Sequence, residues 1–142
     1  MKRVVVVSGY FNPIHIGHIN LMAEAKKIGD YLVVIVNNDE QVKLKGSHPF
    51  MPELERIEII KAIGFVDEVF LSVDKDKSVV ESLKIIAKKY PEELYFANGA
   101  DRNLSNIPEA EICQKLNIKT IDGVGGKKVQ SSSWLLAKNS KN

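Results

Sequence analysis

An α/β fold is predicted for this chain, with a five-stranded parallel sheet that carries helices on both faces. The prediction rests on two observations. Short runs of β-branched and apolar residues alternate along the chain with segments of helical periodicity, a pattern typical of βαβ units with right-handed crossovers. The length of 142 residues suits one ordinary domain, and we assign residues 1–142 to a single one.

The first half of the chain begins with the most buried element that the sequence predicts. Residues 2–8 are a β-branched run too continuous for a strand with one solvated face, which indicates a central parallel strand. Helices are recognised by apolar residues at three- and four-residue spacing, by a glycine at the end and by a proline in the first turn. The expected elements are a strand at 2–8, a helix at 16–28, a strand at 31–36, a helix at 52–63 and a strand at 67–73.

The second half continues the same alternation. Its expected elements are a charged turn at 74–77, a helix at 78–89, a strand at 94–97, a helix at 108–116, a strand at 118–121, a glycine loop at 123–126 and a last helix from about Ser131. The final residues, 138–142, are polar and are expected to fray.

Composition excludes several classes of function. The net charge of +2 and the pI near 8.6 are too mild to indicate nucleic-acid binding. No apolar run approaches the ~20 residues of a membrane span, so we expect no membrane partner. The single cysteine, Cys113, rules out an internal disulfide, fits a reducing cytoplasm and is expected to pack on a helix.

Polar side chains gather where the predicted strands end. They occupy residues 8–18, 37–45, 98–102 and 123–133. In open parallel sheets the ligand lies beyond the carboxyl ends of the strands. One composite site at this edge is therefore predicted.

The segment from Gly9 to His18 is the most informative part of that edge. It follows a buried strand and opens a helix, whose N-terminus offers unpaired N–H groups and a partial positive charge to an anion. His15 and His18 share one helical face, and Gly17 leaves room for a base or ribose. We expect the two histidines to be catalytic and the other candidates here to bind nucleotide, namely Tyr10, Phe11, Asn12 and Gly17. The alternative is a structural role for the imidazoles.

Such a cluster suits attack on the α-phosphate of a nucleotide. The attacking phosphate oxygen is already ionised, so positioning and positive charge should supply most of the rate. Lys43 and Lys45, in a stretch expected to be flexible, fit this need, with Lys45 catalytic and Lys43 nucleotide-binding; the alternative is that they are solubilising. Arg56 is expected to clamp phosphate oxygens, or else to form a surface salt bridge with a neighbouring glutamate.

Two further groups complete the predicted site. Gln130 and the serines after it resemble a second phosphate-binding helix start, although a plain N-cap explains serines equally. At the end of the fourth strand, Gly99 and Asp101 are expected to bind nucleotide, and Arg102 and Asn103 the acceptor; an Asx turn is the alternative. The serines are Ser131, Ser132 and Ser133.

These groups, in this order, resemble the cytidylyltransferase-like nucleotidyltransferases, whose His-x-Gly-His signature is His15-Ile16-Gly17-His18 here. The resemblance covers nearly the whole chain and is strongest to glycerol-3-phosphate cytidylyltransferases and heptose-phosphate adenylyltransferases. It implies a Rossmann-like domain, a lysine loop at Lys43 and Lys45, and phosphate contacts from the serine triplet. Asn12 and Pro13 are more similar to nicotinamide-mononucleotide adenylyltransferases.

The expected activity is transfer of CMP from CTP onto a small phosphorylated alcohol or sugar, with release of pyrophosphate. Chain length and the lysine loop favour CTP. Transfer of AMP from ATP to heptose phosphate, nicotinamide mononucleotide or flavin mononucleotide is the first alternative, and a non-catalytic nucleotide-binding domain is the second. The resemblance also implies Mg²⁺, held mainly by phosphates and not by side chains, and a homodimer.

Overall fold

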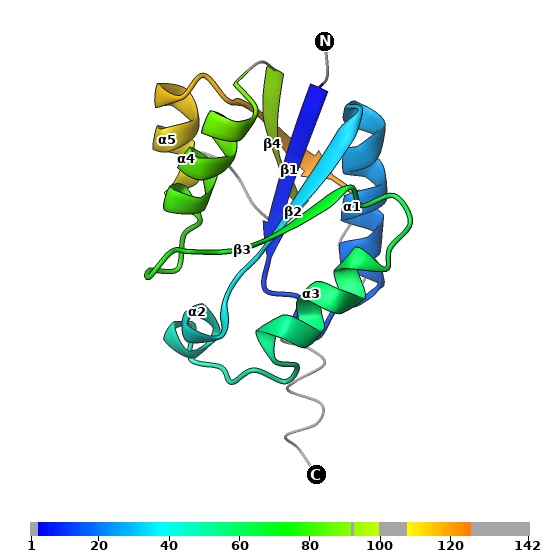
Figure 1. Cartoon of the computed structure of the whole chain (residues 1–142), viewed down its shortest axis with the longest axis vertical. Coiled ribbons are helices and arrows are strands. Elements are labelled where there is room, and N and C mark those ends of the chain that lie inside the picture. Colours follow the sequence, from blue (N-terminus) through cyan, green and yellow to red (C-terminus); the bar gives the residue numbers. More distant parts are fainter. Residues whose placement is uncertain (1–2, 92, 100–107, 126–142) are drawn as a thin grey trace.

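Five parallel strands form one sheet in the order β3-β2-β1-β4-β5. The computed structural model describes residues 3–91, 93–99 and 108–125. The predicted α/β class and the all-parallel sheet are confirmed, and the polypeptide crosses between strands through helices (Figure 1). The strands are β1 (Arg3–Gly9), β2 (Tyr31–Val36), β3 (Glu68–Leu71), β4 (Glu93–Gly99) and β5 (Lys119–Val124).

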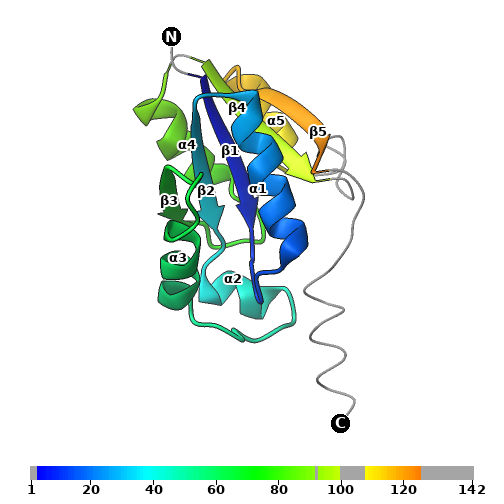
Figure 2. The same cartoon turned by 90° about the vertical axis from the view of Figure 1, so that its right-hand side faces the viewer.

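Helices cover both faces of this sheet. In Figures 1 and 2, α1 and α3 lie on one face, and α4 and α5 on the other. In the part of the chain that is described, no helix has the length and apolar character needed to cross a membrane. The helices are α1 (Ile16–Ile28), α2 (Asp39–Leu44), α3 (Glu53–Lys61), α4 (Val80–Lys89) and α5 (Glu109–Lys115).

The central strand β1 divides its side chains between two hydrophobic cores. Val4 and Val6 pack with α4 and α5, whereas Val5 and Val7 pack with α1 and α3. All four are buried, and a valine taken fully out of water contributes roughly 1.5–3 kcal/mol. Burial on both faces is why this strand is β-branched without alternation. Cys113 packs in the first core, and burial raises the pKa of its thiol to about 12.

Most element boundaries differ from the sequence prediction by at most two residues, and two differences are larger. Residues 39–44 form α2, where a flexible stretch was expected. Its start is fixed by Asn38, whose Oδ1 accepts from the Gln41 N–H, while the Gln41 Oε1 accepts from the Asn38 N–H; such reciprocal capping stabilises a short helix. Gly123 belongs to β5, which extends to Val124 after a register shift beside Ala97 and Gly99.

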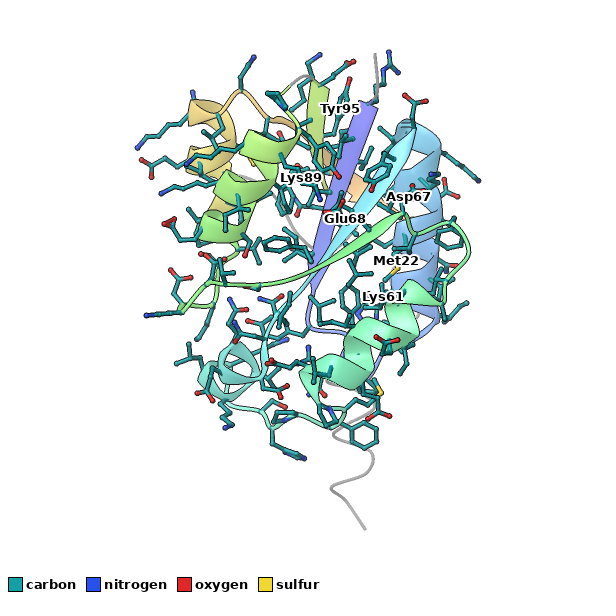
Figure 3. The ribbon with its side chains drawn as sticks, in the orientation of Figure 1. Met22, Lys61, Asp67, Glu68, Lys89 and Tyr95 are labelled. Atoms are coloured by element: carbon teal, nitrogen blue, oxygen red, sulfur yellow. The ribbon has the colours of Figure 1, made fainter. Side chains whose placement is uncertain are left out.

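A polar cluster closes the amino ends of the strands, away from the predicted site. The Glu68 carboxylate accepts hydrogen bonds from the hydroxyls of Tyr31 and Tyr90 and from Lys89 Nζ, at 3.0, 2.5 and 3.1 Å. Glu68 and Lys89 join β3 to the end of α4 (Figure 3). Burial alone would raise the pKa of Glu68, but the hydrogen bonds from these three partners outweigh it and hold the pKa below its usual value.

Candidate active site at the carboxyl edge of the sheet

The turn between β1 and α1 is shaped by Phe11 folding back into the core. Phe11 has a φ of 51°, and its ring is buried beneath the turn. A Cβ on Gly9 would stand 2.8 Å from that ring, so only glycine allows the fold-back. The phenyl edge meets the ring of His18, with centroids 4.8 Å apart. The Phe11 side chain thus packs against His18. We call residues 10–18, which join β1 to the first turn of α1, the histidine turn.

The two imidazoles cap α1 reciprocally. His15 Nδ1 accepts from the Gly17 N–H at 3.1 Å, and His18 Nδ1 accepts from the His15 N–H at 3.1 Å. Their rings stack with centroids 3.8 Å apart. An imidazole whose Nδ1 accepts carries its proton on Nε2 when neutral. The backbone N–H groups therefore polarise two rings whose Nε2–H groups are hydrogen-bond donors.

Helix α1 also differs from the other described helices in the charge at its start. Its first turn holds no acidic side chain. Asp or Glu occupies the first turn of α2, α3, α4 and α5, and at α4 the Asp74 carboxylate accepts from two backbone N–H groups as well. Carboxylates there neutralise the positive end of a helix. Among the described helices, α1 is therefore the one whose positive end has no acidic side chain in its first turn to neutralise it.

Lys43, in α2, and Lys45, which follows its last residue, lie differently. Lys45 Nζ stands over the ring of Tyr10, 4.3 Å from its centroid, which brings one cation to the histidine turn. Lys43 extends along the exposed face of α2 toward Glu40, 3.3 Å away. Lys45 is thus the lysine whose contacts join it to the predicted site.

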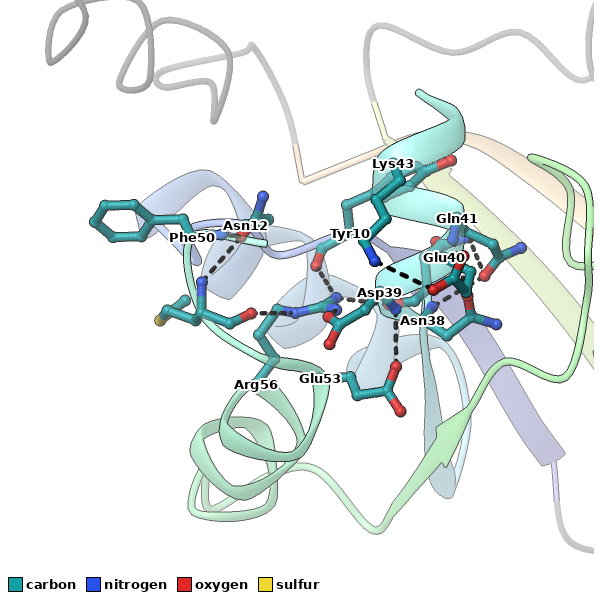
Figure 4. A network of polar contacts seen from close by, with 12 residues as sticks. Tyr10, Asn12, Asn38, Asp39, Glu40, Gln41, Lys43, Phe50, Glu53 and Arg56 are labelled. Atoms are coloured by element: carbon teal, nitrogen blue, oxygen red, sulfur yellow. Dashed lines mark hydrogen bonds and ion pairs between the residues drawn. The ribbon is translucent and has the colours of Figure 1, made fainter. Parts of the chain in front are cut away.

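Arg56 is the clearest departure from the sequence prediction. Its side chain has no exposed surface, so it is neither a surface salt bridge with a neighbouring glutamate nor open to a phosphate. Its guanidinium donates to three carbonyl oxygens and to the Asp39 carboxylate (Figure 4). The carbonyls belong to Tyr10, Asn37 and Met51, at 2.7, 2.6 and 2.9 Å. Arg56 therefore ties the ends of β1 and β2 to α2 and to the segment before α3.

Asn12 is likewise occupied by the protein. Its Oδ1 accepts from the backbone N–H groups of Phe50 and Met51, at 2.6 and 3.2 Å, and its Nδ2 donates to the His48 carbonyl at 2.8 Å. The side chain is buried. Asn12 holds the segment before α3 against the histidine turn, a role that its place in the motif did not indicate.

Sequence reasoning also missed the polar residues that fix the neighbouring loops. Gln41 Nε2 donates to the Asp76 and Ser78 carbonyls, at 2.7 and 2.8 Å. Asn38 Nδ2 donates to two further carbonyls of the loop between β3 and α4. The three-residue spacing of Asn38 and Gln41 is that of a capping box and could have revealed α2. The long-range bonds have no such local signal.

Other predicted residues lie at the edges of the described structure. Gly99 ends β4 beside Val124, and a Cβ on Gly125 would stand 3.0 Å from the Leu21 Cα, so the chain leaves β5 against α1. An open groove of about 570 Å³ lies between β5 and the second half of α1, and none of the predicted site residues that are described lines it. Outside the described residues lie Asp101, Arg102, Asn103, Gln130, Ser131, Ser132 and Ser133, with the expected last helix and the polar end.

A parallel sheet with an imidazole-capped helix at its carboxyl edge defines a nucleotide-binding α/β protein. Residues 6–131 match the sequence profile of the family described as cytidylyltransferase-like. The chain belongs to that family of nucleotidyltransferases, as its signature indicated.

Proteins similar to this chain include an FAD synthase and a bifunctional protein. The chain is 36% identical over 121 residues to an FAD synthase of Pyrococcus horikoshii, covering 84% of this chain and 79% of the relative. It is 36% identical over 115 residues to the bifunctional protein HldE of Koribacter versatilis, covering 80% of this chain and 22% of that protein. A crystal structure of a lipopolysaccharide core biosynthesis protein from Thermoplasma volcanium matches with a TM-score of 0.70 at 25% identity, over 90% of this chain and all of that one.

Proposed function

We propose that this protein transfers AMP from ATP to the phosphate of flavin mononucleotide, forming FAD and releasing pyrophosphate. The observation that carries the proposal is the start of α1, where two stacked imidazoles replace the carboxylates found at the other described helix starts. The acceptor and the nucleotide are supported by the likeness to an FAD synthase over most of both chains.

The chemistry asks for charge stabilisation and needs no protein nucleophile. An oxygen of the flavin phosphate attacks the α-phosphorus of ATP in line, and the bond from that phosphorus to the bridging oxygen breaks as pyrophosphate leaves. Negative charge gathers on the non-bridging and leaving oxygens. His15 and His18 donate Nε2–H bonds to these oxygens, and Lys45 adds a positive charge beside the same turn. Because the donors are fixed by the α1 cap, they need little reorganisation during the reaction.

Mg²⁺ is proposed to arrive with the triphosphate. This ion keeps several waters and binds substrate phosphates more readily than it enters a cage of side chains. The described residues contain no group of three or more His, Cys, Asp or Glu that could hold a metal. When bound, the ion would neutralise the leaving pyrophosphate, and the residues of this chain would orient the phosphates around it.

The choice of ATP departs from the preference for CTP that chain length and the lysine loop gave. The similarity to an FAD synthase over most of both chains is given more weight here, and it favours ATP. CTP with a phosphorylated alcohol therefore becomes the alternative to test, and a non-catalytic nucleotide-binding domain is the remaining one. Homodimer formation stays a prediction.

The test measures pyrophosphate release with ATP or CTP, each offered with flavin mononucleotide, heptose phosphate or glycerol 3-phosphate. Release with ATP and flavin mononucleotide alone supports the proposal. Release only with CTP, or only with an acceptor lacking a flavin, contradicts it. No release with any pair favours the nucleotide-binding alternative.

The role of the histidines is tested by substitutions that preserve the helix start. Helix α2 of this chain uses Asn38 and Gln41 as a capping box, so His15→Asn and His18→Gln copy onto α1 a cap that already works here. We expect each to lower turnover by on the order of a hundredfold or more. The free energy of unfolding should change by less than about 0.5 kcal/mol. Near-normal turnover in both variants would remove the imidazoles from the mechanism.

A further inference from the structure

The segment between α2 and α3 has a fixed backbone beside the histidine turn. Residues 48–51 donate two backbone hydrogen bonds to the Asn12 side chain and accept one from it and one from Arg56. Both of these side chains are almost completely buried. Because Asn12 stands three residues before His15, the position of this segment is set relative to the helix start.

This fixed backbone presents an aromatic ring to solvent. Phe50 is 51% exposed, and in Figure 4 its ring points away from the polar network that holds its main chain. Leu54, one turn further on in α3, is 70% exposed. A single exposed apolar residue is ordinary on a protein surface. Here, however, Phe50 lies on a segment bonded directly to the histidine turn, and a second exposed apolar residue follows it four positions later.

The acceptor of the proposed reaction has two chemically different ends. Its phosphate must reach the α1 start, and the rest of the molecule must lie beyond it along the rim of the site. A phenyl face stacks favourably on a flat ring system, and it offers no hydrogen bond to the hydroxyl groups of a sugar phosphate. The exposed ring therefore suits an acceptor with a planar aromatic group.

We propose that Phe50 contacts the isoalloxazine ring of the acceptor and determines acceptor specificity, with Asn12 as the residue that positions it. This inference rests on the proposed function, since it assigns the acceptor end of the same site. Phe50 would then discriminate between flavin mononucleotide and non-aromatic phosphates, while the histidine turn binds the phosphate common to both.

The experiment compares Phe50→Ala and Phe50→Trp with the wild-type protein and with Ile85→Ala. Ile85 is 45% exposed on α4, so it is a control of similar exposure outside the site. Binding of flavin mononucleotide alone is followed by flavin fluorescence, and the KM values for ATP and for flavin mononucleotide are measured in the pyrophosphate assay. We expect Phe50→Ala to weaken flavin binding and raise the flavin KM about tenfold. Phe50→Trp should restore both, and the ATP KM should stay within about twofold throughout.

Several outcomes would overturn the inference. They are unchanged flavin binding in Phe50→Ala, an equal effect from Ile85→Ala, an equal rise in the ATP KM, or a change in oligomeric state that shows the ring covering a second copy. Failure of the proposed function is distinguishable from these. A wild-type protein that releases no pyrophosphate, yet binds the flavin in a Phe50-dependent way, would refute the reaction and support the ring contact.

Discussion

Replacing Arg56 by alanine should destabilise the protein more than any surface substitution. The change removes a guanidinium with no exposed surface and leaves three carbonyl oxygens and the Asp39 carboxylate without their donor. Each buried acceptor left without a partner costs about 1–3 kcal/mol, and breaking a buried ion pair costs about 3–5 kcal/mol. The terms overlap, and Asp39 is 28% exposed, so water replaces part of what is lost. We therefore expect a loss of about 3–5 kcal/mol in the free energy of unfolding.

The measurement is urea denaturation monitored by circular dichroism. It compares the free energies of unfolding of three variants, provided that their m-values equal that of the wild type. In Arg56→Lys the charge is kept, but the lysine ammonium cannot reach all four acceptors at once. This variant should therefore lose about 2 kcal/mol in the free energy of unfolding. Arg3→Ala is the matched control, because Arg3 forms only an exposed pair with Glu93 at 3.5 Å, and it should cost less than about 0.5 kcal/mol. If Arg56→Ala were as mild as Arg3→Ala, the buried hub would have no energetic importance and our reading of it would be wrong.

Two other predictions concern charge. Lys45→Ala should raise the ATP KM about tenfold, since it removes a cation from the histidine turn. Lys84→Ala, which loses only an exposed pair with Glu81, is the control in the same steady-state assay. Equal KM values in the two variants would show that Lys45 has no part in binding ATP. Glu68→Gln should make the free energy of unfolding depend less strongly on pH in the acid range. The folded-state pKa of Glu68 is lowered, so its carboxylate stabilises the fold above the unfolded pKa near 4.3, and this contribution disappears as the pH falls through the folded pKa. Denaturation midpoints between pH 3 and pH 7 would check this, and parallel curves for the variant and the wild type would refute it.

The parts of the fold that were predictable from sequence are those with a local cause. The run from Val4 to Val7 indicated a doubly buried strand, and its two cores are present. The helix over residues 16–28 was predicted with the bounds that the structure gives, because apolar spacing and a following glycine both mark it. The histidine turn was located for the same reason, since a strand, a glycine and a helix start adjoin there.

The parts that escaped prediction depend on contacts between distant segments. Nothing near Arg56 in the sequence distinguishes it from a solvated helix arginine, and its burial comes from carbonyls up to 46 residues away. Asn12 bonds to backbone groups 36 to 39 residues away. Local patterns carry no information about such partners. Both residues were therefore expected to touch the ligand, whereas in the structure they bond to backbone groups of distant segments.

The most direct test of an active site at the start of α1 is to measure which ring nitrogens of His15 and His18 carry a proton, and whether their resonances respond to a nucleotide. Nitrogen-15 NMR of the histidine rings reports which nitrogen carries the proton, and the chain offers His48, exposed and outside the α1 cap, as an internal reference. On addition of a non-hydrolysable ATP analogue with Mg²⁺, the Nε2–H resonances of His15 and His18 should both shift while that of His48 stays in place. Nε2-deprotonated rings, or resonances that ignore the nucleotide, would contradict an active site at the start of α1.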